Sequence, residues 1–79
     1  MPQLITLRNG DLLRINPVDK CKLEFSRNNG VTWIFRTRYT GIGEFLDIVD
    51  VGTELLATTT KGLYYSRNNG VSWIYRHRL

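Results

Sequence analysis

Apolar and polar residues alternate along short segments of this chain, as they do in strands that bury one face of a β-sheet. β-Branched and aromatic residues are frequent in these segments, and no segment has the period of a helix. The clearest case is the segment 31–38, whose residues divide between two faces of an extended chain: Val31, Trp33, Phe35 and Thr37 on one, and Thr32, Ile34, Arg36 and Arg38 on the other. The pattern predicts an all-β fold.

The same alternation predicts two groups of four strands. The first group is 3–8, 11–16, 22–26 and 31–38, and the second is 45–51, 54–60, 63–66 and 71–78. Pro17 and Lys61-Gly62 mark the middle turns. Asn29-Gly30 and Asn69-Gly70 predict tight primed hairpin turns, because Asn and Gly tolerate the positive φ that such turns require. Each group should therefore form a four-stranded antiparallel sheet.

The two groups are related by an internal repeat. Residues 23–38 (LEFSRNNGVTWIFRTR) and 63–78 (LYYSRNNGVSWIYRHR) align without gaps at an offset of 40 and are identical at 11 of 16 positions. The segments before them, 4–15 and 46–58, are related more loosely. We interpret residues 1–79 as one domain, with repeat one at 1–38, a linker at 39–44 and repeat two at 45–79. Four antiparallel strands in about forty residues is the size of one β-propeller blade.

Each repeat also carries the same turn sequence, SRNNGVTW at 26–33 and SRNNGVSW at 66–73. It resembles the Asp-box motif, or BNR repeat, of sialidase-like β-propellers, whose pattern is Ser-x-Asp-x-Gly-x-Thr-Trp. In that family the motif lies in the hairpin between the third and fourth strands of a blade, where our strand prediction also places it. The resemblance implies propeller blades and gives a structural role to Ser26, Asn28, Gly30, Thr32, Trp33, Ser66, Asn68, Gly70, Ser72 and Trp73.

The roles of these turn residues follow from their chemistry. Ser and Asn side chains can accept backbone N–H groups of the turn, Gly supplies the unusual backbone, and Trp covers the corner. Asn28 and Asn68 stand where the family has Asp, so the acceptor is kept while the carboxylate that would hold a cation is absent. Sialidase activity does not follow from the resemblance, because the arginines and acids of a sialidase site are not identifiable here.

Two blades cannot close a propeller, and their apolar faces and edges need cover. Self-association is one solution, in which three or four copies would give six or eight blades. The other is a chain whose two sheets pack on each other as a sandwich. We favour a homo-oligomer, because a core in a chain of 79 residues with one Cys, and so without an intrachain disulfide, is marginal alone.

Composition and the absence of catalytic patterns argue against an enzyme. The formal net charge is +4, and the chain shows no catalytic carboxylate pair, nucleophile relay or phosphate-binding glycine loop. His77 lacks a partner at metal spacing, and Cys21 is interpreted as an ordinary thiol. We expect no catalytic residues, metal or cofactor. Without an apolar run of about 20 residues or a signal peptide, we expect a cytoplasmic protein with no membrane association.

Three functions remain open. A multivalent carbohydrate-binding module would use exposed aromatic residues among Tyr64, Tyr75, Trp33 and Trp73. A polyanion- or nucleic-acid-binding protein would use arginines predicted to share one strand face: Arg36, Arg38, Arg76 and Arg78. A scaffold or assembly protein would need no small ligand. The sequence favours a non-enzymatic binding or scaffold protein without choosing its ligand.

Overall fold

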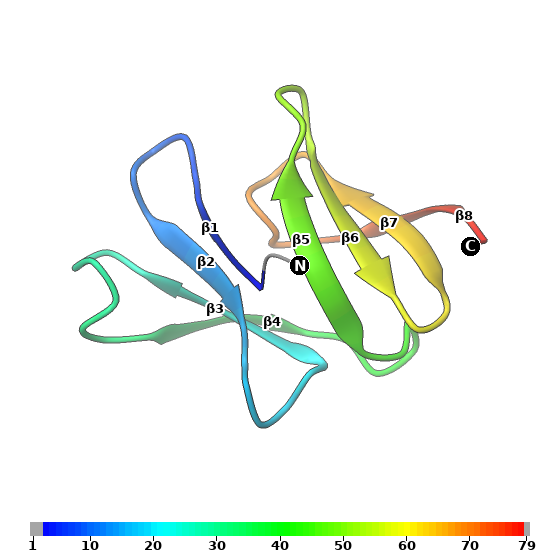
Figure 1. Cartoon of the computed structure of the whole chain (residues 1–79), viewed down its shortest axis with the longest axis horizontal. Helices are drawn as coiled ribbons and strands as arrows, with labels where there is room; N and C mark the ends of the chain where they lie inside the picture. Colours follow the sequence, from blue (N-terminus) through cyan, green and yellow to red (C-terminus); the bar gives the residue numbers. More distant parts are fainter. Residues whose placement is uncertain (1–2, 79) are drawn as a thin grey trace.

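The fold consists of two four-stranded antiparallel sheets (Figure 1). The structure, a computed structural model, describes residues 3–78 and contains no helix within that range. Sheet one contains β1 (Leu4–Thr6), β2 (Leu12–Ile15), β3 (Lys22–Ser26) and β4 (Ile34–Arg38). Sheet two contains β5 (Phe45–Asp50), β6 (Leu55–Thr59), β7 (Gly62–Ser66) and β8 (Ile74–His77). The all-β prediction is confirmed.

Both sheets follow one plan, which reflects the sequence repeat. The strands are hydrogen-bonded in the order β1-β2-β3-β4 and β5-β6-β7-β8. Leu12 pairs with Ser26 in sheet one, and Leu55 pairs with Ser66 in sheet two. A bulge also interrupts the last strand pair of each sheet at the same place, after Leu23 or Leu63. Positions in the two sheets can therefore be matched residue by residue.

The predicted fourth strands were wrong at their beginnings. β4 starts at Ile34 and β8 at Ile74, so the three residues before each strand belong to a longer loop and not to a two-residue primed turn. Asn29 and Asn69 do have positive φ, 66° and 62°. The loops are longer because side chains of the turn sequence bind their backbone N–H groups and hold them out of the sheet.

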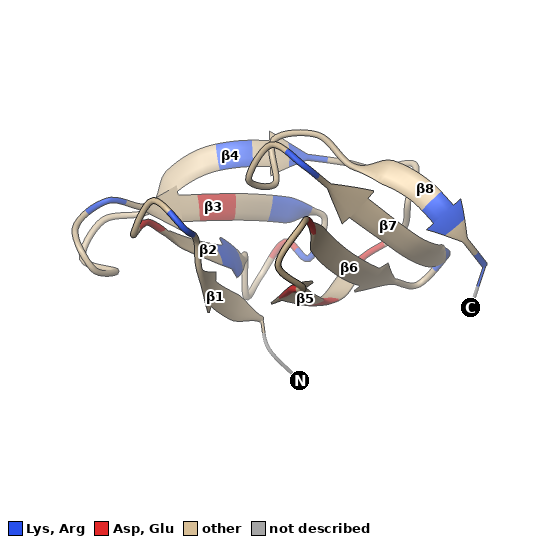
Figure 2. Cartoon of the chain, turned by 90° about the horizontal axis from the view of Figure 1, so that it is seen from above, with Lys and Arg blue, Asp and Glu red and all other residues tan. Residues whose placement is uncertain are grey.

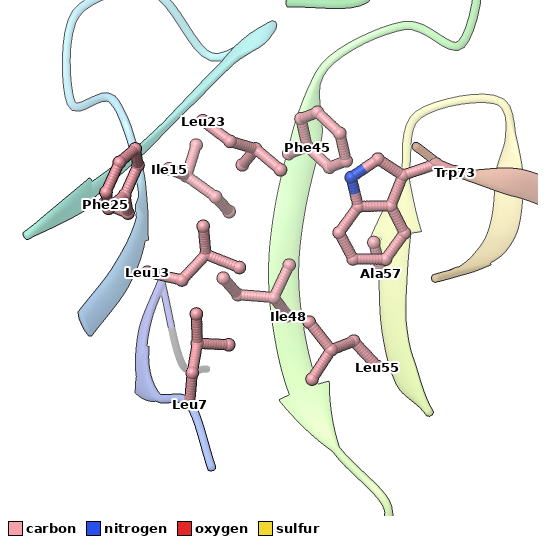
Figure 3. Packing of buried hydrophobic residues seen from close by; sticks show 10 residues of the cluster. All are labelled: Leu7, Leu13, Ile15, Leu23, Phe25, Phe45, Ile48, Leu55, Ala57 and Trp73. Atoms are coloured by element: carbon pink, nitrogen blue, oxygen red, sulfur yellow. The ribbon is translucent and has the colours of Figure 1, made fainter. Parts of the chain in front are cut away.

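One apolar core lies between the sheets (Figure 3). β5 packs against β1 and β2, and these are the main strand contacts between the sheets. Sheet one and the turn after β1 supply Leu7, Leu13, Ile15, Leu23 and Phe25. Sheet two and the loop before β8 supply Phe45, Ile48, Leu55, Ala57 and Trp73. Corresponding strands lie on the same side of the molecule, β1 with β5 and β4 with β8 (Figure 2).

The two sheets bury opposite faces of their shared plan. The strand pairing makes Leu12 equivalent to Leu55, and Leu13 equivalent to Leu56. Sheet one buries Leu13, whereas sheet two buries Leu55 and leaves Leu56 half-buried. The sheets therefore stack front to back, and over residues 3–78 each keeps one face that the other sheet does not cover.

Candidate functional site

The two turn sequences form the same hydrogen-bonded structure. Ser26 Oγ accepts the N–H groups of Asn28 (3.3 Å) and Gly30 (2.8 Å), and Asn28 Oδ1 accepts the N–H of Thr32 (2.9 Å). In repeat two, Ser66 Oγ accepts from the N–H of Gly70 at 2.9 Å. Two further bonds match those of repeat one: Ser66 Oγ accepts the N–H of Asn68 at 3.4 Å, and Asn68 Oδ1 accepts that of Ser72 at 3.0 Å. Asn68 Nδ2 also donates to Ser72 Oγ at 2.8 Å, a bond that differs from repeat one. Asn thus serves as the acceptor.

The two tryptophans of these turns lie in different environments. Trp73 is 7% exposed, its ring centroid lies 5.6 Å from that of Phe45, and its Nε1–H donates to Gly70 O at 3.0 Å. Trp33 is half-buried, and the guanidinium carbon of Arg14 lies 4.2 Å from its ring centroid. Burial removes Trp73 from the aromatic residues that were expected to stack on a sugar.

Beside each turn, two arginines lie against one aromatic ring. In repeat one the guanidinium carbons of Arg27 and Arg36 are 5.2 Å and 4.0 Å from the ring centroid of Phe25. In repeat two those of Arg67 and Arg76 are 5.2 Å and 4.3 Å from the ring centroid of Tyr65.

The bulges explain the position of the second arginine. Thr37 pairs with Leu23 and Phe35 with Glu24, which leaves Arg36 as the extra residue. Arg76 is the extra residue of sheet two in the same way. A bulge redirects a side chain in this manner, and it breaks the strand alternation on which the shared arginine face was predicted.

An acidic residue accompanies each arginine pair, and the two acids differ in length. Glu54 directly precedes β6, and Asp11 occupies the equivalent place before β2. Glu54 Oε2 lies 2.8 Å from Arg76 Nη1, and its Oε1 lies 3.0 Å from Arg76 Nη2 and 3.4 Å from Arg67 Nε. Asp11 Oδ2 lies 4.0 Å from Arg27 Nε. Glu54 therefore forms ion pairs with both of its arginines, whereas Asp11 forms one with Arg27 only.

Because Asp11 is shorter than Glu54, Arg36 has no acidic partner in the described part of the chain, whereas Arg76 has one. Among residues 3–78, no carboxylate forms an ion pair with Arg36, and its Nε is buried without a hydrogen-bond partner. Burial lowers the pKa of the Arg36 guanidinium, and the charge of Arg27 acts in the same direction while Asp11 opposes it. A partly buried charge without a partner is unfavourable, so this position stands out in the chain.

The other arginines predicted as a binding face are mostly paired within the chain. Arg38 Nε donates to Asp19 Oδ2 at 2.7 Å, which raises the pKa of Arg38 and lowers that of Asp19. Arg76 is held by Glu54 as described, and Arg78 is exposed. Basic residues lie on both β4 and β8 (Figure 2), but two of the four predicted arginines are already paired with acids.

Two of the predicted aromatic residues, Tyr64 and Tyr75, lie together on sheet two. Tyr64 and Tyr75 form an edge-to-face pair with ring centroids 5.5 Å apart. Tyr64 is half-buried and Tyr75 is 52% exposed. Phe35, the equivalent of Tyr75, is 57% exposed and was not among the predicted binding residues. Each sheet thus offers one accessible ring on its last strand.

In each repeat, two arginines, one aromatic ring and one acid form a cluster. The sequence-based prediction did not include the first arginine or the acid of either cluster. Arg27 and Arg67 occur at the same place in the repeat, and an acid precedes Leu-Leu in both halves. That coincidence is the signal that could have revealed the clusters. It was hidden because the acids lie in the loosely related half of the repeat.

A small hollow lies where the turn after β1 meets sheet two. Its volume is about 110 Å³, below the few hundred Å³ of a typical small-molecule pocket. It is lined by Leu7, Arg8, Asp50, Thr53, Glu54, Leu55, Ser66, Arg67 and Asn69. Arg8 and Asp50 lie 3.8 Å apart at its rim, so charges of both signs surround it.

Comparisons with protein-family models, curated proteins and solved structures found no match to the chain. Over residues 3–78, no three His, Cys, Asp or Glu side chains are grouped so that they could hold a metal ion. The same part of the chain has no helix with the length and apolar character needed to cross a membrane.

Proposed function

We propose that the protein is a non-enzymatic binding or scaffold module that works as a closed homo-oligomeric ring of Asp-box-like blades. The observation that supports this proposal is the front-to-back stacking of the two sheets. A face-to-face pair would cover the equivalent face of each sheet and leave two identical faces outside. Front-to-back stacking leaves two different faces, which match the two faces already packed together inside the chain.

The open face of sheet two is defined by Leu56, Thr58, Leu63 and Tyr65, which are half-buried. Their equivalents in sheet one are Leu13, Ile15, Leu23 and Phe25, all buried in the core. The open face of sheet one is defined by Leu12, Arg14, Glu24 and Trp33, and its equivalents are Leu55, Ala57, Tyr64 and Trp73. A second copy can therefore repeat the internal packing, with its sheet one on the first copy's sheet two.

The close contact between Gly70 and Leu13 would have to be repeated between copies by their equivalents, Gly30 and Leu56. Gly70 lies so close to sheet one that an added Cβ would be 2.9 Å from Leu13 Cδ2. Its equivalent, Gly30, has no close neighbour from the other sheet. In the proposed ring, Gly30 of one copy takes the place of Gly70 and lies against Leu56 of the next.

The proposed contact between copies is more polar than the internal one. Arg14 stands where sheet two has Ala57, and its Nε donates to Glu24 Oε1 at 2.9 Å. Lys22 Nζ lies 3.5 Å from the other carboxylate oxygen of Glu24. Interfaces between chains carry more polar groups than cores do, and the ion pair is already satisfied before association.

A ring would present every surface feature once per copy, which suits multivalent binding. We propose carbohydrate as the ligand class of this oligomer, since Phe35 and Tyr75 offer one accessible aromatic side chain per blade. The test is binding to a glycan array by the wild type and by Phe35→Ala and Tyr75→Ala. Loss of signal in both variants supports this ligand. Steep salt dependence of binding with both variants unaffected would favour a polyanion and contradict it.

The assembly is tested by a charge on the open face of sheet two. Leu56→Arg should convert the oligomer to a folded monomer, because the arginine would be buried without a partner at the contact. Val51→Arg, in the exposed turn before β6, is the matched control and should leave the mass unchanged. Sedimentation measures the mass, and circular dichroism checks the fold. Equal masses for both folded variants would contradict the proposed contact.

A further inference from the structure

We propose that Arg27 and Arg36, lying against Phe25, form a carboxylate-binding site in repeat one. The two guanidinium carbons are 5.2 Å and 4.0 Å from the Phe25 ring centroid, so both charged groups lie beside one apolar surface. This inference does not depend on the proposed oligomer, because all residues of the site belong to sheet one and the turns next to it.

Repeat two shows which group such a site accepts. There the equivalent arginines, Arg67 and Arg76, hold the carboxylate of Glu54. Arg76 binds it through both terminal nitrogens, at 2.8 Å and 3.0 Å, the fork geometry that matches a carboxylate. In repeat one the internal acid contacts Arg27 only, so the same arrangement of arginines is expected to accept a carboxylate from outside at Arg36.

Asp11 does not occupy the site of repeat one. It is one methylene shorter than Glu54, and its Oδ2 stays 4.0 Å from Arg27 Nε. Asp11 is also bound to the turn, since its backbone N–H donates to Asn9 Oδ1 at 3.0 Å and its Oδ2 accepts from Asn9 Nδ2 at 3.4 Å. The terminal group of Arg36 consequently keeps its capacity for an anion.

The condition of Arg36 favours binding. Its Nε is buried and has no hydrogen-bond partner among the residues that the structure describes. Burial lowers the pKa of this guanidinium, so its charged form gains from a nearby anion. The Arg27 side chain is 73% exposed, which gives a ligand access from solvent.

The charge of the site selects a monoanion. Two arginines and Asp11 leave a net charge of about +1, which one carboxylate balances. A dianionic phosphate would bring a second negative charge close to Asp11. The ligand is therefore a carboxylate, either that of a small organic acid or that of an acidic side chain on a protein.

The experiment uses two opposite variants and sodium acetate as the probe. The N–H signals of the arginine side chains are followed by NMR during titration, with sodium chloride at equal ionic strength as the control. The wild type should bind one acetate, with the largest shifts at Arg36. Asp11→Glu should fill the site internally and weaken binding by about tenfold or more. Glu54→Asp should open the site of repeat two and add a second acetate.

Two further variants and probes complete the test. Arg27→Ala, an exposed change that leaves Phe25 in place, should weaken acetate binding at least severalfold. A glycine-rich peptide with one Glu distinguishes the sources: about tenfold tighter binding than acetate indicates a protein side chain, and equal binding indicates a small acid. Asp11→Glu binding acetate like the wild type, chloride causing the same shifts, or phosphate binding more tightly than acetate would overturn the assignment.

Discussion

Replacement of Trp73 by Ala should destabilise the chain far more than the same change at Trp33. The repeat provides this comparison, since both residues end the same turn sequence and differ in what covers them. Trp73 is 7% exposed and packs on Phe45 with ring centroids 5.6 Å apart. Trp33 is half-buried, beneath the guanidinium of Arg14 at 4.2 Å.

The magnitudes follow from burial. Removing a buried Trp side chain typically lowers the free energy of unfolding by about 3–5 kcal/mol. A domain of this length has about 4–12 kcal/mol in total, so Trp73→Ala should remove roughly a quarter or more of its stability. Trp33→Ala loses partial burial and a cation–π contact of about 0.5–1 kcal/mol, and we expect about 1–2 kcal/mol altogether.

Urea unfolding followed by circular dichroism measures both losses, at a protein concentration low enough to avoid association. Trp73→Phe serves as a graded variant that keeps an aromatic ring against Phe45 and should lose less than Trp73→Ala. Equal destabilisation by Trp33→Ala and Trp73→Ala would contradict the assignment of Trp73, and not Trp33, to the apolar core.

Two other predictions concern one turn glycine and one buried acid. Gly70→Ala should lower the urea midpoint more than Gly30→Ala: both have φ near +90°, but the new Cβ would lie 2.9 Å from Leu13 Cδ2 at position 70 and no closer than 3.7 Å to another atom at position 30. Equal midpoints would contradict this packing. The pKa of Glu24 is below its ordinary value of 4.5: burial raises it, but hydrogen bonds from Arg14 and Asn16 and nearby positive charge together outweigh burial. Its contribution to stability is therefore complete above pH 4.5 and is lost as pH falls through the lower folded-state pKa. Urea midpoints between pH 3 and 6 should fall more steeply for the wild type than for Glu24→Gln, and parallel curves would argue against the linkage.

The fold could be predicted from sequence because its information is local and occurs twice. Alternation within strands, two Asn-Gly pairs and the 40-residue offset were sufficient for two four-stranded sheets. The first residues of β4 and β8 could not be predicted from alternation. They depend on side-chain bonds of Ser26 and Asn28, and of their equivalents, which convert strand-like residues into loop.

The candidate site was less predictable, because it depends on differences between the repeats. Trp33 and Trp73 are identical in sequence, and only the stacking of the sheets decides which is buried. Arg36 and Arg76 are also identical, and one methylene in the acid beside each decides whether its charge is matched. A bulge that no residue pattern announces turns both arginines onto the rings of Phe25 and Tyr65.

We propose that copies of this chain stack on one another as its own two sheets do. The most direct test is the absolute mass of the wild type by light scattering after size exclusion, over a dilution series at low and high salt. We expect one discrete oligomer of the 9.2 kDa chain, of three or four copies, with no larger species growing as concentration rises. A monomer that persists at the highest concentration, or an open-ended series of masses, would contradict it.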